Sequence, residues 1–142
     1  MCSSDLIAAV MIEAARKKFP EADFRVLDIL EQDCGQFDFV ASSGIFNTRI
    51  SEADEEYRIF VRRMIQKMFQ ICRFGVAVNF QSSQVLEEYP QIKLHESFKR
   101  YYYYDPVEML NFAKDLTKRF VLRHDYHAAD FTIFLIKNYG EG

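Results

Sequence analysis

The clearest alternation of apolar and polar positions lies between residues 51 and 73, where an apolar residue recurs every third or fourth position. This spacing predicts an amphipathic helix with basic residues on its opposite side. Ser51 favours a helix start at this point, and Gly75 is expected to end the helix. The apolar stripe consists of Tyr57, Phe60, Val61, Met64, Ile65, Met68 and Cys72. We interpret its methionines as core packing rather than as a ligand groove.

Two further helices are predicted. The first spans residues 7–18 and ends at Phe19-Pro20, because a proline disfavours helical geometry at the residue before it. The second begins at Asp105, where an Asp N-cap, Pro106 at the first helical position and Glu108 at the third form a strong start signal. Its apolar side consists of Val107, Met109, Leu110, Phe112, Ala113 and Leu116.

Short apolar runs between these helices predict five strands. They are residues 24–30, 37–41, 74–80, 120–126 and 131–137. The third run is apolar on both faces, as is typical of a central parallel strand. The last two are separated by only four residues, which permits antiparallel pairing alone. Helices and strands that alternate in this way predict an α/β fold with a mostly parallel sheet and a C-terminal antiparallel hairpin. Residues 81–104 show no firm period.

Composition narrows the class of protein. The length of 142 residues predicts a single domain over residues 1–142. The aromatic residues are 14 Phe and 8 Tyr with no Trp, which indicates either a core built on phenylalanine or a piece of a larger protein. The net charge of −3 provides no attraction to nucleic acid or to an anionic membrane. Three cysteines without CxxC spacing argue against a disulfide framework and favour a reducing, cytoplasmic compartment. No apolar stretch approaches the ~20 residues of a membrane span, and no secretory signal is recognised.

Three stretches resemble parts of class I S-adenosylmethionine-dependent methyltransferases, which have a Rossmann-like sheet. Residues 11–20 and 24–29 (MIEAARKKFP and FRVLDI) resemble the second cofactor-contacting stretch of that family. Residues 37–47 (FDFVASSGIFN) resemble its fourth strand and the loop beyond it, and residues 123–135 are similar to its sixth and seventh strands. The resemblance covers residues 10–137. It implies a sheet of strand order 3-2-1-4-5-7-6 and S-adenosylmethionine as the cofactor.

The sequence also departs from this family. Its Gly-rich cofactor loop is missing, since none of the 5 glycines precedes Gly35, and the one candidate for the ribose-binding acid, Asp5, lies one residue too far from Met11. Residues 1–6 resemble a translated sequencing adapter, so we regard them as a non-native leader. We therefore expect an N-terminally truncated methyltransferase domain without its first strands. Residues 37–41 would then form an exposed sheet edge, or would pair directly with residues 24–30.

The resemblance implies a set of cofactor-binding residues at the carboxyl ends of strands. The carboxylate of Asp28 would accept a hydrogen bond from the adenine amino group, with the backbone of Ile29 nearby; the alternative is that Asp28 caps a turn. Ser42, Ser43 and Gly44 would contact the cofactor near its sulfonium. Gly44 would permit close backbone approach, although a plain turn glycine is an equally good interpretation.

Four residues are assigned to the side of the pocket that would hold the methyl acceptor. Phe46 and Asn47 would line this side, and Tyr103 and Tyr104 would form a wall over the substrate. Packing on the sheet is the main alternative for these tyrosines. Stacking on a single-stranded nucleic acid is a weaker one, because the basic residues before them suit such a contact.

The histidines do not indicate a catalytic or metal site. His124 and His127 flank Asp125 without a metal-ligand spacing, so a solvated turn is the better interpretation. Methyl transfer needs mainly orientation, and we assign no catalytic residue and no metal. The sequence predicts the C-terminal part of a methyltransferase with a small-molecule acceptor, inactive by itself. The alternative is a non-catalytic, methyltransferase-like binding module. The acceptor and the oligomeric state stay open.

Overall fold

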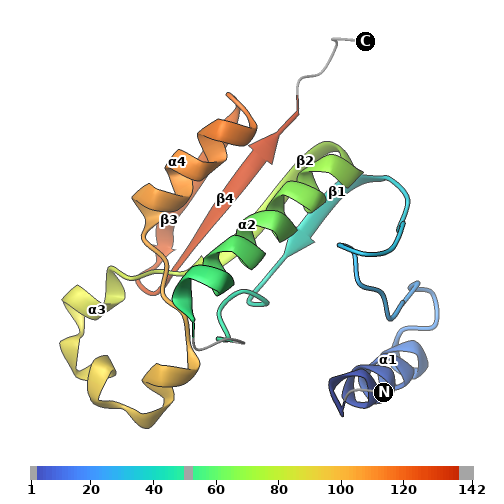
Figure 1. Ribbon diagram of the computed structural model, residues 1–142, viewed down its shortest axis with the longest axis horizontal. Helices are drawn as coiled ribbons and strands as arrows, with labels where there is room; N and C mark the ends of the chain where they lie inside the picture. Colours follow the sequence, from blue (N-terminus) through green and yellow to red (C-terminus); the bar gives the residue numbers. More distant parts are fainter. Residues whose placement is uncertain (1–2, 50–52, 138–142) are drawn as a thin grey trace. The chain divides into compact units, whose positions relative to one another are not determined.

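The computed structural model describes residues 3–49 and 53–137, which form two compact units that divide after Cys34 (Figure 1). The first unit contains helix α1 (Ser3–Lys18), which ends directly before Phe19-Pro20 as predicted. Three basic residues in its last turn suit the negative end of the helix dipole. Beyond the helix, the Arg16 guanidinium donates a hydrogen bond of 2.6 Å to the carbonyl oxygen of Phe24.

The strand predicted at residues 24–30 is wrong. The chain there is irregular and ends in a turn, and no strand in the described part of the protein pairs with it. An isolated apolar run gains nothing from extended geometry, because a strand is stabilised by the ladder that it forms with a neighbour. The direct pairing of this run with residues 37–41, which was the alternative to an exposed edge, is therefore wrong as well.

The second unit is built on a four-stranded sheet of order β1-β2-β4-β3. Its strands are β1 (Phe37–Ser42), β2 (Cys72–Gln81), β3 (Phe120–His127) and β4 (Asp130–Ile136). β1 pairs with β2 in parallel, whereas β2 with β4 and β3 with β4 are antiparallel. This is the 4-5-7-6 part of the expected order, so the α/β sheet with a C-terminal antiparallel hairpin is confirmed. Within these four strands one pairing is parallel and two are antiparallel, so the sheet is mixed rather than mostly parallel. β1 is an edge strand, as expected.

Helices α2 (Asp54–Ile71) and α4 (Pro106–Leu116) cover the same face of this sheet (Figure 1). The core between the layers is formed by the buried residues Tyr57, Val61, Ile65 and Met68 of α2, Met109, Phe112 and Ala113 of α4, Val76, Val78 and Phe80 of β2, and Phe131, Ile133 and Leu135 of β4. The apolar stripe of α2 is thus core packing, as interpreted from the sequence. On α4, Val107 was expected on the apolar side, but its side chain is 60% exposed and lies outside the core.

The two ends of α2 differ from the prediction. The N-cap residue is Ala53, whose side chain cannot cap the helix, and Ser51 lies outside the described residues. Gly75 does not end the helix, because α2 ends at Ile71 and Gly75 lies inside β2. A Cβ atom on Gly75 would be 2.9 Å from the carbonyl oxygen of Leu135. The glycine is therefore required by the close approach of β4 rather than by a helix stop.

The predicted start of α4 is confirmed. Asp105 Oδ1 accepts a hydrogen bond of 2.8 Å from the backbone nitrogen of Val107, and Pro106 follows the cap. The segment without a sequence period contains α3 (Val85–Glu88) and two short 3₁₀ helices, Pro90–Leu94 and Glu96–Arg100, and connects the end of β2 to α4 (Figure 1). Within residues 3–49 and 53–137, no helix is long and apolar enough to cross a membrane.

Candidate functional site

The loop that follows β1 begins with a tight turn at Gly44. Its φ of +74° lies in the left-handed region that favours glycine, and the backbone nitrogen of Asn47 closes the turn on the carbonyl oxygen of Gly44 at 3.2 Å. Apart from Gly44 and its two chain neighbours, no described residue has an atom within 4 Å of the position that a Cβ would occupy. Gly44 is therefore a turn glycine and also leaves open space beside the backbone, so both interpretations of its role are compatible with the geometry.

Ser42 and Ser43 occupy the carboxyl end of β1 with different surroundings. The Ser42 hydroxyl oxygen is buried and has no hydrogen-bond partner among the residues that the structure describes, whereas Ser43 is exposed. A buried polar atom without a partner is costly, and such atoms often contact a ligand. Of the two serines, Ser42 is thus the one whose hydroxyl group could form a hydrogen bond with a ligand.

Phe46 and Tyr104, assigned from the sequence to the acceptor side, both lie in the core. Phe46 is 1% exposed and Tyr104 is 4% exposed, and their rings pack against Phe80 with centroids 6.1 Å and 4.7 Å away. The Tyr104 hydroxyl donates a hydrogen bond of 2.6 Å to the carbonyl oxygen of Phe46. The packing alternative thus describes Tyr104 well, and any influence of these two residues on a substrate would act through the shape of the loop.

Tyr57 of α2 is a second anchor of this loop, and sequence reasoning placed it only in the apolar stripe. Its hydroxyl oxygen lies 2.6 Å from the carbonyl oxygen of Phe46 and 2.9 Å from that of Thr48. Burial raises the pKa of Tyr57, and burial followed by the hydrogen bond with Tyr57 raises the pKa of Tyr104. Both phenols therefore stay protonated hydrogen-bond donors at neutral pH.

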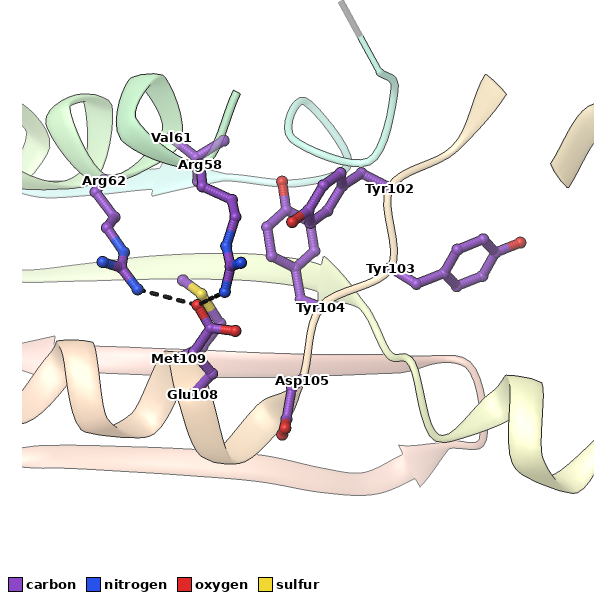
Figure 2. Close-up of a pocket in the computed structure, with 9 residues that line it drawn as sticks. All are labelled: Arg58, Val61, Arg62, Tyr102, Tyr103, Tyr104, Asp105, Glu108 and Met109. Atoms are coloured by element: carbon purple, nitrogen blue, oxygen red, sulfur yellow. Dashed lines mark hydrogen bonds and ion pairs between the residues drawn. The ribbon is translucent and has the colours of Figure 1, made fainter. Parts of the chain in front are cut away.

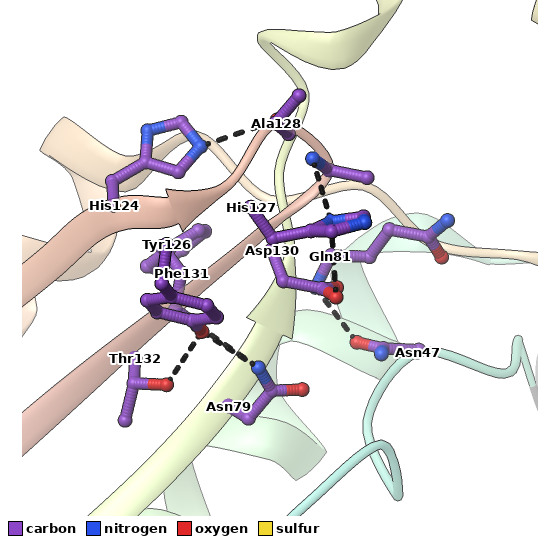
Figure 3. Close-up of polar contacts among 11 residues, drawn as sticks. Asn47, Asn79, Gln81, His124, Tyr126, His127, Ala128, Asp130, Phe131 and Thr132 are labelled. Carbon is purple, nitrogen blue, oxygen red and sulfur yellow. Dashed lines mark hydrogen bonds and ion pairs between the residues drawn. The ribbon is translucent and has the colours of Figure 1, made fainter.

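The side chain of Asn47 connects this loop to the end of β2 by a hydrogen bond (Figure 3). Its side-chain oxygen Oδ1 accepts a hydrogen bond of 2.9 Å from the backbone nitrogen of Gln81, and its backbone carbonyl accepts one of 2.8 Å from the nitrogen of Tyr102. The carboxyl ends of the two parallel strands are thus joined by a single side chain. This is the edge of the sheet at which open α/β sheets bind ligands.

Arg58 and Arg62 of α2 converge on Glu108 of α4 below the tyrosine run (Figure 2). Arg58 forms a hydrogen-bonded ion pair with Glu108, and Arg62 Nη2 lies 3.0 Å from the same carboxylate oxygen. The cavity beside them has a volume of only ≈ 30 Å³, which has room for a few water molecules at most. We therefore regard this cluster as a link between the helices and not as a ligand pocket.

Tyr103 differs from its neighbours because it points away from this cluster (Figure 2). It is partly exposed and its ring stacks on Phe98 with the centroids 5.5 Å apart. Of the two tyrosines that were predicted to form a substrate wall, Tyr103 is the one with an accessible side chain.

Asp28 and Ile29 lie in the first unit, within the turn that replaces the predicted strand. Asp28 Oδ1 accepts a hydrogen bond of 2.9 Å from the backbone nitrogen of Leu30, and its own nitrogen donates to Gln32 Oε1 at 2.9 Å. The carboxylate therefore caps a turn, as the alternative interpretation has it. Its role toward an adenine ring stays a prediction.

The histidines of the hairpin make contacts within their own turn (Figure 3). His127 Nδ1 accepts a hydrogen bond of 3.1 Å from the nitrogen of Ala129, and His124 Nε2 lies 3.4 Å from the carbonyl oxygen of Ala128. Asp125 bonds instead to Arg123, and this hydrogen bond lowers the pKa of its carboxyl group. These contacts favour the solvated-turn interpretation.

Comparison with known proteins identifies the fold. No protein-family model and no curated protein matches the sequence. Among solved structures, magnesium protoporphyrin IX methyltransferase (ChlM) from Synechocystis PCC 6803 with bound SAH is similar, with 13% identity, a TM-score of 0.60 and coverage of 90% of this chain and 59% of that chain. The same enzyme with bound SAM gives a TM-score of 0.57 and coverage of 55% of its chain.

An O-methyltransferase family protein from Burkholderia thailandensis is similar as well, with 13% identity and a TM-score of 0.60 over 91% of this chain and 41% of that chain. At such low identity the similarity shows the fold alone, a methyltransferase-like fold whose sheet has four strands in the described residues. The chain spans about half the length of these proteins.

Proposed function

We propose that this chain is the C-terminal part of an S-adenosylmethionine-dependent methyltransferase that acts on a small molecule. The observation that carries the proposal is the agreement of nearly the whole chain with methyltransferases, one of them solved with bound SAH and SAM. The order of the four strands agrees with it, because it equals the last four strands of the order that the sequence resemblance implied.

The residues at the carboxyl end of β1 fit a bound cofactor. The buried Ser42 hydroxyl has no partner in the described residues, and the backbone at Gly44 has open space beside it. A ligand at this end would supply the missing partner of Ser42 and could approach the backbone at Gly44 closely. We assign Ser42, Ser43 and Gly44 to the part of the cofactor near its sulfonium, and Asp28 and Ile29 to the adenine.

S-adenosylmethionine supplies an activated methyl group when it is bound, so the protein contributes mainly orientation and exclusion of water. On the acceptor side, Asn47 and Tyr103 offer accessible groups. Phe46 and Tyr104 act through the loop, because the hydroxyl groups of Tyr57 and Tyr104 hold the carbonyl group of Phe46 in place. No residue of this chain is assigned as a general base, which methyl transfer requires only when the acceptor must lose a proton early.

The chain by itself is expected to be inactive in this proposal. No glycine precedes Gly35, so the backbone loop that would contact the methionine portion of the cofactor has no counterpart here. A longer parent protein would provide it, together with the acidic residue for the ribose. The acceptor, the cytoplasmic location and the fragment nature of the chain belong to this proposal.

A non-catalytic methyltransferase-like binding module is the second candidate. It is favoured by the contacts of Asp28, whose carboxylate already caps a turn. The two candidates differ in the upstream coding sequence. A strand followed by a Gly-rich loop favours the enzyme, whereas a degenerate loop favours the module.

The experiment compares the 142-residue chain with a version extended by its upstream coding sequence. Calorimetric titration with S-adenosylmethionine should show micromolar affinity for the extended protein only, and labelled methyl groups should pass to a small-molecule fraction. Ser42→Ala in the extended protein should weaken cofactor binding, while Ser83→Ala, in the turn two residues beyond β2, serves as the matched control. An extended protein that folds but binds no cofactor would support the binding module.

A further inference from the structure

The face of the sheet opposite α2 and α4 carries large apolar side chains that are exposed. Phe39, Val121 and Phe134 are 67%, 44% and 39% exposed. A hollow with a volume of ≈ 550 Å³ lies over this face, and residues from all four strands line it. Most of these residues are apolar, and exposed apolar patches of this extent mark interaction surfaces in soluble proteins.

The register of the strands gives this face a trough beside a ridge. On β2, positions that alternate with the core residues are taken by Gly75 and Ala77, which have no side chain or only a methyl group. On β4, Phe134 lies directly beside Ala77, and Ile136 lies beside Gly75. The small residues of β2 therefore form the trough, and the larger residues of β4 form a ridge that runs along it.

The charge on this face is neutralised within one copy of the chain. Arg123 is the charged residue among those that line the hollow. Its Nε and Nη2 atoms donate to the two carboxylate oxygens of Asp125 at 2.7 Å and 2.8 Å. An occupant of this face therefore needs no complementary charge, and two identical faces bring no unpaired like charges together.

We infer that this face binds the same face of a second copy of the chain, so that the ridge of each copy lies in the trough of the other. A two-fold axis that runs parallel to the strands, between β2 and β4, produces this arrangement. Because Phe134 and Ala77 are paired in register, the rotation places Phe134 of one copy over Ala77 of the other. Sheets that pack face to face lie about 10 Å apart, so a large side chain is best opposed by a small one.

The edge of β1 is another surface at which two copies could meet. This strand has only six residues, carries the charged Asp38 and has an irregular register between Phe37 and Phe39. Short length, a charge and a bulge are the means by which proteins protect a sheet edge from pairing. The open face lacks such protection, so it is the more favourable of the two contacts.

The size of the face sets the strength of this dimer. Four strands at a spacing of ~4.8 Å and seven paired residues at ~3.3 Å each give an area of roughly 450 Å². Two such faces together approach the lower limit of about 1,000 Å² for specific interfaces. We therefore expect a weak dimer, with a dissociation constant on the order of 10–100 μM.

The inference goes beyond the proposed function and does not depend on it. Ser42 and Gly44, which are assigned to the cofactor, are not among the residues that line the hollow. A dimer formed through this face would therefore leave the carboxyl end of β1 accessible, and the cofactor titration and the dimer measurement can each fail separately.

Sedimentation equilibrium of the 142-residue chain, from about 5 μM to about 500 μM, should show a monomer that becomes a dimer. Phe134→Lys should raise the dissociation constant at least tenfold, because it would place a charge in the apolar trough of the other copy. Circular dichroism should show that this variant is folded, since Phe134 is partly exposed. Ile59→Lys is the matched control, because Ile59 is an apolar residue of α2 that is 51% exposed, and it should leave the dimer unchanged.

A second measurement needs no variant. In a mixture of ¹³C-labelled and unlabelled chains, isotope-filtered NMR should detect a contact between the Phe134 ring of one copy and the Ala77 methyl group of the other. A monomer at every concentration would overturn the inference and leave the face to a different partner, such as a segment of a longer parent protein. A dimer that Phe134→Lys does not weaken, or contacts between copies that lie at the edge of β1 instead, would overturn it as well.

Discussion

The two phenols that meet at the Phe46 carbonyl allow a quantitative test of how the loop after β1 is held. Tyr104→Phe removes one buried hydrogen bond of 2.6 Å, but Tyr57 still satisfies the carbonyl oxygen. Such a loss costs about 0.5–1.5 kcal/mol of unfolding free energy, and Tyr57→Phe should cost a similar amount. The double variant leaves the buried carbonyl of Phe46 without either phenol. An unsatisfied buried acceptor costs a further 1–3 kcal/mol or so, which makes the double change worse than the sum of the single ones.

Urea unfolding of the four proteins, followed by circular dichroism, measures this coupling. With a slope of about 2 kcal/mol per M, each single change should lower the midpoint by roughly 0.5 M, and the double change by roughly 1.5 M or more. Tyr103→Phe is the control, because its ring lies outside this pair, and it should change the midpoint little. Strictly additive effects of the two single changes would refute the idea that the phenols share one carbonyl oxygen.

Three further predictions concern other links between sequence and structure. Burial raises the pKa of Tyr57 and of Tyr104 above 10.0, so the stability that these phenols provide is complete below about pH 10 and falls as the pH rises beyond it. In thermal melts between pH 8 and pH 11, the variant that carries both Tyr57→Phe and Tyr104→Phe should show a smaller decline of melting temperature. Gly75→Ala should lower the free energy of unfolding by roughly 1–3 kcal/mol, since its Cβ would lie 2.9 Å from the carbonyl oxygen of Leu135. Ala77→Val is the control on the same strand, because Ala77 lines an open cavity on the sheet, and it should cost much less in the same urea assay. Asp28→Ala in the extended protein should reduce S-adenosylmethionine affinity roughly ten- to a hundredfold by calorimetry. An unchanged affinity with a lower melting temperature would show that Asp28 is only the cap that binds the Leu30 nitrogen.

The sequence by itself determined the elements whose signals are local. The sequence specifies the stripe of α2, the Asp105-Pro106 start of α4 and the short connection of the hairpin through residues that lie close to each of them. Helix periodicity, capping and short loop closure are physical constraints on neighbouring residues, so they can be recognised without knowledge of the fold. The same holds for β2, whose apolar residues 74–78 match the position of this strand between two others.

Only the tertiary structure decided the features that depend on distant partners. Residues 24–30 have the composition of a strand, but no neighbour completes the backbone ladder. Gly75 resembles a helix stop, and its actual constraint is the carbonyl of Leu135, which is sixty residues further along the chain.

The candidate site shows the same division. The motif after β1 was recognisable in the sequence, and the structure places Ser42, Gly44 and Asn47 at one strand end. The anchoring of this loop by Tyr57 and Tyr104 could not be read from the sequence, because a tyrosine in an apolar stripe gives no indication of where its hydroxyl will find an acceptor. Local patterns specify which face of an element is buried, whereas the polar partners inside that face are set by how the elements pack together.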